Sequence, residues 1–216
     1  AAFVGGVKIW DTTGGKETDS FSIQLGRYVE ISPDATRVAY SDRTHCVRDL
    51  KSQEIIRSRG PESRRPPVWR PDGKQLASTT DNGPIVIWDA QTGEVVSSIL
   101  TKADQFSSPA WSPKGRFIAA FCPNRTTKVW DTSAFPPLFS LSVPTLYDTT
   151  VAFSPDGGRL LAAIGDGTLK VVAVESGRVV LSMQYDKERA SAGQCAAWSP
   201  DGRRFAVRMR SDHVMI

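Results

Sequence analysis

The stretch Ser154-Pro155-Asp156-Gly157 decides the fold, because close copies of it recur along the whole chain. Proline at the second position sets φ to about −65°, and glycine at the fourth accepts the positive φ of a tight turn. A spacing of about forty residues between copies is typical of repeat architectures. The chain is therefore predicted to be one supersecondary unit copied along its length. The other proline turns are Ser32-Pro33-Asp34-Ala35, Arg70-Pro71-Asp72-Gly73, Ser112-Pro113-Lys114-Gly115 and Ser199-Pro200-Asp201-Gly202.

Each repeat is predicted to contain four short strands. In the second complete repeat, runs of β-branched and aromatic residues at 67–69, 74–79, 84–89 and 94–99 alternate with turns rich in Gly, Pro, Asn and Asp. This punctuation is typical of tight hairpins. Ala35 stands where the other turns have glycine, so that turn is expected either to carry strain or to take another form.

A second motif follows the proline turns at a fixed distance. Trp88-Asp89 and Trp130-Asp131 end the third strand of their repeats, 17 residues after the turn proline. Trp10-Asp11 is a further copy, and Arg48-Asp49 and Val172-Ala173 are degenerate ones. The chain resembles the WD-repeat β-propeller family, whose repeats combine a Ser-Pro-Asp-Gly hairpin with a closing Trp-Asp. The resemblance covers essentially all 216 residues and implies an all-β fold, a β-propeller of four-stranded antiparallel blades.

The chain departs from the family pattern in one respect. Family members usually carry Gly-His before the first strand, and that histidine joins a buried hydrogen-bond network with an aspartate, a serine or threonine, and the tryptophan. Neither His45 nor His213 follows a glycine. We therefore expect less rigid blades than is usual in the family. The aspartates at the loop position of the network are expected to be exposed or to cap turns; they are Asp42, Asp81, Asp166 and Asp212.

The repeats predict a single propeller domain, residues 1–216, cut within a blade at both ends. Residues 6–9 and 213–216 occupy equivalent places in their repeats. Two arrangements fit this duplication: a closed five-bladed ring with one copy displaced, or a segment of a larger ring of six to eight blades, which we favour. Flanking domains of a larger chain or assembly are expected. The blades are a partial blade at 1–26, blades at 27–60, 61–103, 104–145 and 146–189, and a partial blade at 190–216.

Composition excludes several classes of protein. No run of 18 apolar residues is present, so no membrane span is predicted. Cys46, Cys122 and Cys195 are odd in number and lack metal-ligand spacing, which favours free buried thiols in a reducing compartment. The expected location is cytoplasmic, with the nucleus as the other intracellular option.

No catalytic, metal or cofactor site is predicted, and the chain is not expected to be an enzyme. Two histidines and three scattered cysteines supply too few zinc ligands. No serine lies in a Gly-x-Ser-x-Gly nucleophile motif. The stretch 165–167, Gly-Asp-Gly, aligns with 81–83 of another repeat and is interpreted as a hairpin turn rather than as a ligand cradle.

The tryptophans fall at two repeat positions. Phe153 and Ile31 replace tryptophan at the first position, which favours packing between blades over a ligand cage. The first position holds Trp69, Trp111 and Trp198, and the second holds Trp10, Trp88 and Trp130.

The predicted binding surface is the variable-loop rim, formed by the second-to-third strand loops and the links between blades. The proline turns and the turns after Trp-Asp share the other rim and are short and repetitive. Function concentrates in loops that vary on a fixed scaffold, and the family resemblance implies the same face for peptides and partner domains. The candidate residues are Arg43, Arg59, Arg64, Arg65, Asp81, Lys102, Arg125 and Tyr147.

One link is rich in arginine: Arg57, Arg59, Arg64 and Arg65 surround a single acid, Glu62. Guanidinium groups pair with carboxylates or phosphates, although solvated surface charge also accounts for them. We therefore predict a non-catalytic scaffold or sensor for protein–protein interaction, with an acidic or phosphorylated partner. The alternative is a phosphate-directed binder of nucleic acid or phosphoinositide. Nucleic acid is disfavoured, because that link lacks interleaved aromatics for base stacking.

Overall fold

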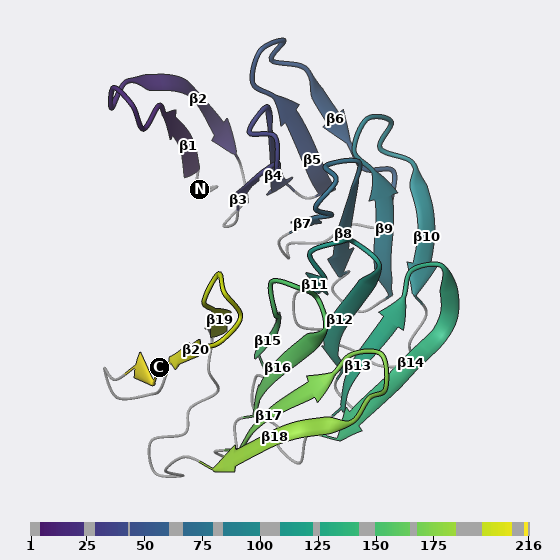
Figure 1. The fold of residues 1–216 in the computed structure, drawn as a ribbon. Coiled ribbons are helices and arrows are strands. Elements are labelled where there is room, and N and C mark those ends of the chain that lie inside the picture. Colours follow the sequence, from purple (N-terminus) through teal and green to yellow (C-terminus); the bar gives the residue numbers. More distant parts are fainter. Residues whose placement is uncertain are drawn as a thin grey trace. The chain divides into compact units, whose positions relative to one another are not determined.

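A computed structural model describes residues 5–23, 29–42, 44–60, 67–79, 84–99, 109–122, 126–142, 150–164, 168–184, 196–208 and 214–215. All the regular secondary structure in these ranges consists of β-strands, as Figure 1 shows. In the same ranges no helix has the length and apolarity of a membrane span. The chain divides into two compact units, residues 1–101 and 102–216.

The first unit holds three antiparallel sheets whose strands pair in chain order. The first sheet contains β1 (Gly5–Trp10) and β2 (Glu17–Ile23). The second contains β3 (Val29–Ile31), β4 (Arg37–Asp42), β5 (Thr44–Asp49) and β6 (Ile55–Arg57). The third contains β7 (Val68–Trp69), β8 (Gln75–Thr79), β9 (Ile85–Asp89) and β10 (Val95–Ile99).

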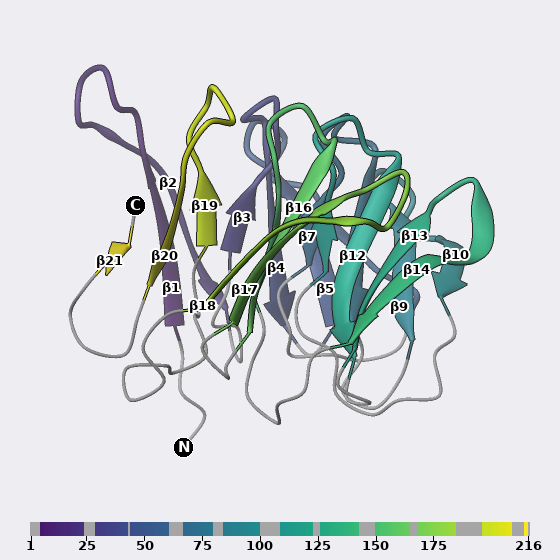
Figure 2. The ribbon, with the colours of Figure 1, turned by 60° about the horizontal axis from the view of Figure 1, so that its bottom comes forward.

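The second unit repeats this arrangement. One sheet contains β11 (Ala110–Trp111), β12 (Phe117–Cys122), β13 (Thr126–Asp131) and β14 (Ala134–Ser142). The next contains β15 (Thr150–Phe153), β16 (Arg159–Ile164), β17 (Thr168–Ala173) and β18 (Val179–Gln184). The last contains β19 (Ala196–Trp198), β20 (Phe205–Arg208) and β21 (Val214–Met215). The β15–β16 and β19–β20 turns lie at the same end of their sheets (Figure 2). The predicted four-stranded antiparallel sheets are confirmed.

The proline turns have the predicted geometry. The backbone N–H of Gly157 donates to the Ser154 carbonyl at 2.8 Å, and Gly157 has φ +75°. Ala35 makes the equivalent bond to Ser32, also at 2.8 Å, and has φ +57°. The alanine turn therefore keeps the common form and carries the strain, because a left-handed backbone brings Cβ close to the following carbonyl, at about 1–2 kcal/mol.

The core lies between neighbouring sheets. In the first unit, Trp88 is fully buried and packs with Ala39 and Val47 of the preceding sheet. In the second unit, Phe117 and Leu160 belong to the same buried cluster although they come from adjacent sheets. Each sheet thus buries apolar side chains against its neighbour, which is the arrangement that stabilises stacked repeats.

Tryptophans at the first position connect neighbouring sheets, as predicted. The Trp69 Nε1–H donates to the Glu30 carbonyl at 3.2 Å, and the Trp198 Nε1–H donates to the Ala152 carbonyl at 3.0 Å. At the second position, Trp88 and Trp130 are buried. The indoles therefore serve packing rather than forming a ligand cage.

Two members of these positions are not buried, and the packing interpretation is wrong for them. Trp10 and Ile31 are each 53% exposed. In the described part of the chain, the sheet of Trp10 consists of β1 and β2 alone, whereas Trp88 lies on a strand paired on both sides. The same two-stranded sheet precedes Ile31, and within the described residues it has no further strand to cover that side chain.

Candidate functional site

Strand register fixes which rim each connection occupies. β4 and β5 pair from Arg37↔Asp49 at the proline-turn end to Asp42↔Thr44 at the other. Likewise, β12 and β13 end their pairing at Cys122↔Thr126. The second-to-third strand connections therefore leave the sheets at the end opposite the proline turns, as the repeat pattern predicts.

Arg59 is the only predicted binding residue within the described ranges. Its backbone N–H donates to the Gly93 carbonyl at 2.8 Å, and its Nη1 lies 2.8 Å from Oε1 of Glu94. Both side chains are more than half exposed, so water screens the ion pair. Arg59 thus lies against the turn that follows Trp88-Asp89 in the next sheet, on the rim of the proline turns rather than on the predicted variable-loop rim, and its charge is already partnered. The other seven lie outside the described residues: Arg43, Arg64, Arg65, Asp81, Lys102, Arg125 and Tyr147.

Next to Arg59, the Arg57 side chain covers a buried thiol. Its Nη1 lies 3.2 Å from the Cys46 sulfur and 3.9 Å from Oδ2 of Asp42. Burial raises the pKa of the Cys46 thiol, and it raises the pKa of neighbouring Tyr40 to about 12. Both groups are therefore neutral near pH 7, and Cys46 is a free buried thiol as predicted rather than a nucleophile.

Of the aspartates at the family's network position, Asp42 is described. It is half-buried and pairs with Arg57, so it differs from the predicted exposed or turn-capping side chain. Cross-strand packing of the long Arg57 side chain over β4 and β5 accounts for this. Asp81, Asp166 and Asp212 lie outside the described residues.

The tryptophan of the family's hydrogen-bond network has a buried N–H in the repeat that contains Trp88. The Trp88 Nε1–H is buried and finds no hydrogen-bond acceptor among the described residues. His45, from the preceding sheet, stacks on the indole with ring centroids 6.1 Å apart. A buried donor without an acceptor costs about 1–3 kcal/mol. This is a physical reason for the reduced rigidity that the sequence predicts.

Two arginines that the sequence analysis did not single out connect neighbouring sheets at the proline turns. The Arg37 Nη2–H donates to the Gly73 carbonyl at 2.7 Å, and the guanidinium lies 5.1 Å from the centre of the Trp69 ring. Arg159 repeats the contact with the Gly202 carbonyl, at 2.7 Å, and with Trp198, at 4.9 Å. This contact is called the arginine bridge below.

A sequence signal for the arginine bridge exists, because both arginines follow the turn proline by four residues. Gln75 and Phe117 occupy the same place in two other repeats. Arginine at this offset, followed one repeat later by tryptophan before the proline turn, would have predicted the contact.

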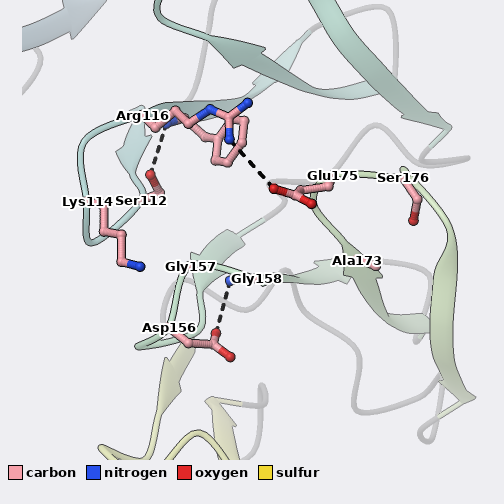
Figure 3. A pocket seen from close by; sticks show the side chains of 10 residues that line it. Ser112, Lys114, Arg116, Asp156, Gly157, Gly158, Ala173, Glu175 and Ser176 are labelled. Atoms are coloured by element: carbon pink, nitrogen blue, oxygen red, sulfur yellow. Dashed lines mark hydrogen bonds and ion pairs between the residues drawn. The ribbon is translucent and has the colours of Figure 1, made fainter.

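A cleft of about 480 Å³ lies beside Phe117, where the arginine bridge is missing. A Cβ added at Gly202 would meet the Arg159 Nη2 at 3.3 Å, whereas one added at Gly157 would first meet Pro113, at 3.5 Å. Figure 3 shows charged side chains around the cleft. They are Lys114, Arg116, Asp156 and Glu175.

The described residues offer no group of three or more His, Cys, Asp or Glu side chains that could hold a metal ion.

Comparisons with known proteins agree with the geometry. Residues 62–112 match the family model of the anaphase-promoting complex subunit 4 WD40 domain, and residues 147–172 match that of the WD domain, G-beta repeat. The protein tipD of Dictyostelium discoideum is 32% identical in an alignment 108 residues long, which covers 44% of this chain and 18% of tipD. The crystal structure of the Cps50 (Swd1) β-propeller domain of Myceliophteria thermophila matches with a TM-score of 0.72 at 16% identity, covering 88% of this chain and 63% of that one.

The chain therefore has the β-propeller fold, and its resemblance to WD repeats is confirmed by the two segments that match the family models. WD-repeat propellers generally act as scaffolds for protein interaction and are typically not catalytic. The chain spans less than a fifth of tipD and less than two thirds of the solved propeller chain.

Proposed function

We propose that this chain is a non-catalytic interaction module that holds a partner protein or peptide on its variable-loop rim. Strand register supports the proposal, because the connections whose sequences diverge leave the sheets at one end, opposite the proline turns. A rigid scaffold with variation confined to one rim is the usual design of a binding surface.

Several proline turns share one local structure. The hydroxyl groups of Ser32, Ser154 and Ser199 donate to the turn aspartate two residues later. These bonds, with backbone N–H donors, hold the pKa of Asp34 at about 2 and also lower that of Asp156 and Asp201. The turn carboxylates are thus engaged in shaping the turns, which is a structural role shared by several repeats.

The proposed partner presents carboxylate or phosphate groups to arginines on the variable-loop rim. Arg59 already pairs with Glu94, so Arg64 and Arg65 of the same link are the proposed anchors. Arginine forks bind such groups through paired hydrogen bonds. Cytoplasmic location is part of the same proposal.

Site-specific photo-crosslinking tests which rim is used. A photoreactive amino acid is placed at Arg125 or Asp81 on the variable-loop rim, and at the exposed Asp72 or Asp201 on the proline-turn rim. We expect protein adducts from the first pair, whether or not the second pair also gives them. Adducts that form only from the proline-turn rim would contradict the proposal.

Binding measurements with the partner isolated in this way then distinguish a protein partner from a polyanion. The double variant Arg64→Ala, Arg65→Ala should weaken binding by about tenfold while unfolding stability stays within about 0.5 kcal/mol, as expected for surface changes. Adducts that nuclease removes, together with a fall of several log units in affinity per log unit of salt, would instead indicate a polyanion.

A further inference from the structure

The cleft beside Phe117 lies where the arginine bridge of other repeats is missing. At two other proline turns, the glycine carbonyl accepts a hydrogen bond from an arginine of the preceding sheet. The equivalent carbonyl of Gly157 accepts no hydrogen bond from the described residues. Because the residue four places after Pro113 is Phe117 rather than arginine, the cleft lacks the guanidinium that fills the equivalent space elsewhere.

One aromatic ring, that of Phe117, lines the cleft. Phe117 is 7% exposed and belongs to a buried cluster against which Phe153 packs, and Phe153 takes the place of the tryptophan in the arginine bridge. Arg116 lies 4.7 Å from the centre of the Phe117 ring, so this ring already accepts a guanidinium on one face. Planar cations stack on aromatic rings in this way.

Two acidic and two basic side chains line the cleft, and one of the basic side chains is paired with an acid outside it. Arg116 is neutralised by Asp131, at 2.9 Å, and lies 3.6 Å from Glu175, as the dashed line in Figure 3 marks. Asp156 accepts a hydrogen bond from the Gly158 N–H at 3.0 Å, and its pKa is lowered by bonds from Ser154 and Gly158. Lys114 supplies the other positive charge. Because Asp131, outside the cleft, neutralises Arg116, the Asp156 and Glu175 carboxylates are balanced only by Lys114, and the surroundings favour a cation.

We propose that this cleft binds an arginine side chain from an extended segment of a partner protein. The incoming guanidinium donates to the Gly157 carbonyl, stacks on the Phe117 ring, and pairs with Asp156 or Glu175. It thereby completes the contact that Arg37 and Arg159 make from within the chain. An anion would instead meet the Gly157 carbonyl oxygen and two carboxylates, with Lys114 as the one lining cation that is not already paired with an acid. The site lies on the rim opposite to the proposed variable-loop site, so it is a second and independent surface.

Peptide titration followed by NMR tests the proposal on the 216-residue chain. The probe is the blocked pentapeptide acetyl-Gly-Ala-Arg-Ala-Gly-amide, with matched peptides carrying lysine or citrulline in place of arginine. We expect shifts at the amides of Gly157, Gly158 and Glu175, and binding about tenfold weaker for citrulline, which lacks the charge that strengthens these hydrogen bonds. Equal affinity for arginine and citrulline would overturn the proposal.

Lys114→Asp separates a cation site from an anion site. The substitution restores the aspartate that the other four proline turns carry, so we expect it to fold. Removing one positive charge and adding a negative one should strengthen binding of the arginine peptide by about threefold or more. Shifts at the same amides on titration with inorganic phosphate, abolished by Lys114→Asp, would show an anion site and overturn the proposal.

Phe117→Arg supplies the missing guanidinium from within the chain. It should abolish binding of the arginine peptide, because the cleft is then occupied. Should this variant fail to fold, Glu175→Gln is the second test: we expect weakening of about threefold at an unchanged melting temperature, since an exposed charge near the site is lost. No change in affinity for Glu175→Gln and Asp156→Asn alike would overturn the proposal. Glu94→Gln, at an exposed acid of the first unit, and the Arg64→Ala, Arg65→Ala pair are the controls and should leave the affinity unchanged.

Discussion

Two interfaces between neighbouring sheets are built from the same repeat yet differ at one position. Between the sheets β3–β6 and β7–β10, Arg37 donates to the Gly73 carbonyl and lies over Trp69. Between the sheets β11–β14 and β15–β18, Phe117 and Phe153 take the places of the arginine and tryptophan, and a cleft is present. The residue four places after the turn proline therefore decides whether the glycine carbonyl of the next turn receives a guanidinium from within the chain.

The difference has a physical cause. A guanidinium reaches across to a backbone carbonyl, whereas a phenyl ring has no donor and turns into the apolar core, where Phe117 is 7% exposed. Both choices bury apolar surface, but only the arginine satisfies the glycine carbonyl of the next turn. An interface can thus keep its hydrophobic core and still lack the hydrogen bond from arginine to the glycine carbonyl.

Removing the indole from the bridged interface should have the largest effect. Trp69→Ala is expected to lower the free energy of unfolding by about 3–5 kcal/mol, because a buried aromatic is lost and a cavity remains. Urea unfolding measures the change. Trp10→Ala is the control: that side chain is 53% exposed, so its loss should cost far less. If both substitutions lower the free energy of unfolding equally, the packing of Trp69 between the two sheets adds no more stability than an exposed tryptophan does.

Removing the arginine bridge should have an intermediate effect. Arg37→Met keeps the aliphatic length but loses a charge-assisted hydrogen bond, worth about 1.5–3 kcal/mol. The matched control is Arg116→Met beside the cleft, where the side chain is 60% exposed and the ion pairs are worth about 0–1 kcal/mol. The comparison fails if both substitutions destabilise equally in urea unfolding.

Relieving the strain at Ala35 should raise the free energy of unfolding. Ala35→Gly removes a left-handed alanine, at φ +57°, and we expect about 0.5–1 kcal/mol of added stability after the entropy that glycine gains in the unfolded chain. Gly73→Ala, at φ +69°, should show the opposite sign. Calorimetric melting of both variants gives the measurement, and a shared sign would contradict the assignment of strain.

The turn aspartates should make stability depend on acid. The Ser32 hydroxyl and the Thr36 N–H hold the pKa of Asp34 at about 2, below the ordinary aspartate value of 3.8. A carboxyl whose pKa is lowered on folding stabilises the protein above the unfolded pKa, and this is lost as pH falls through the folded pKa. The loss therefore falls between about pH 4 and pH 2.

Asp34→Asn is the variant that checks this sign. It should reduce the slope of unfolding stability between these two pH values, measured by urea unfolding at a series of pH. Lys114→Asp, which adds a turn carboxylate, should increase it. A slope that Asp34→Asn leaves unchanged would assign the acid sensitivity to other carboxyl groups.

Local patterns predicted the fold well because its determinants are local. The turn Ser154-Pro155-Asp156-Gly157 encodes its own backbone conformation, and a count of 17 residues from Pro71 places Trp88 at the end of a strand. Burial was predicted less well, as Trp10 and Ile31 show, because exposure depends on which strands stand next to a residue. The arginine bridge was missed since its partners, such as Arg37 and Gly73, lie a whole repeat apart.

The amino-acid sequence by itself determined the repeat, its four strands and its antiparallel register, since each depends on residues within a single hairpin or its neighbour. Only the tertiary structure decided which recess between two sheets stays open. That outcome depends on whether the side chain at Arg37, Phe117 or Arg159 reaches the carbonyl of the next turn. Such contacts form between sheets that the chain brings together only after each has folded.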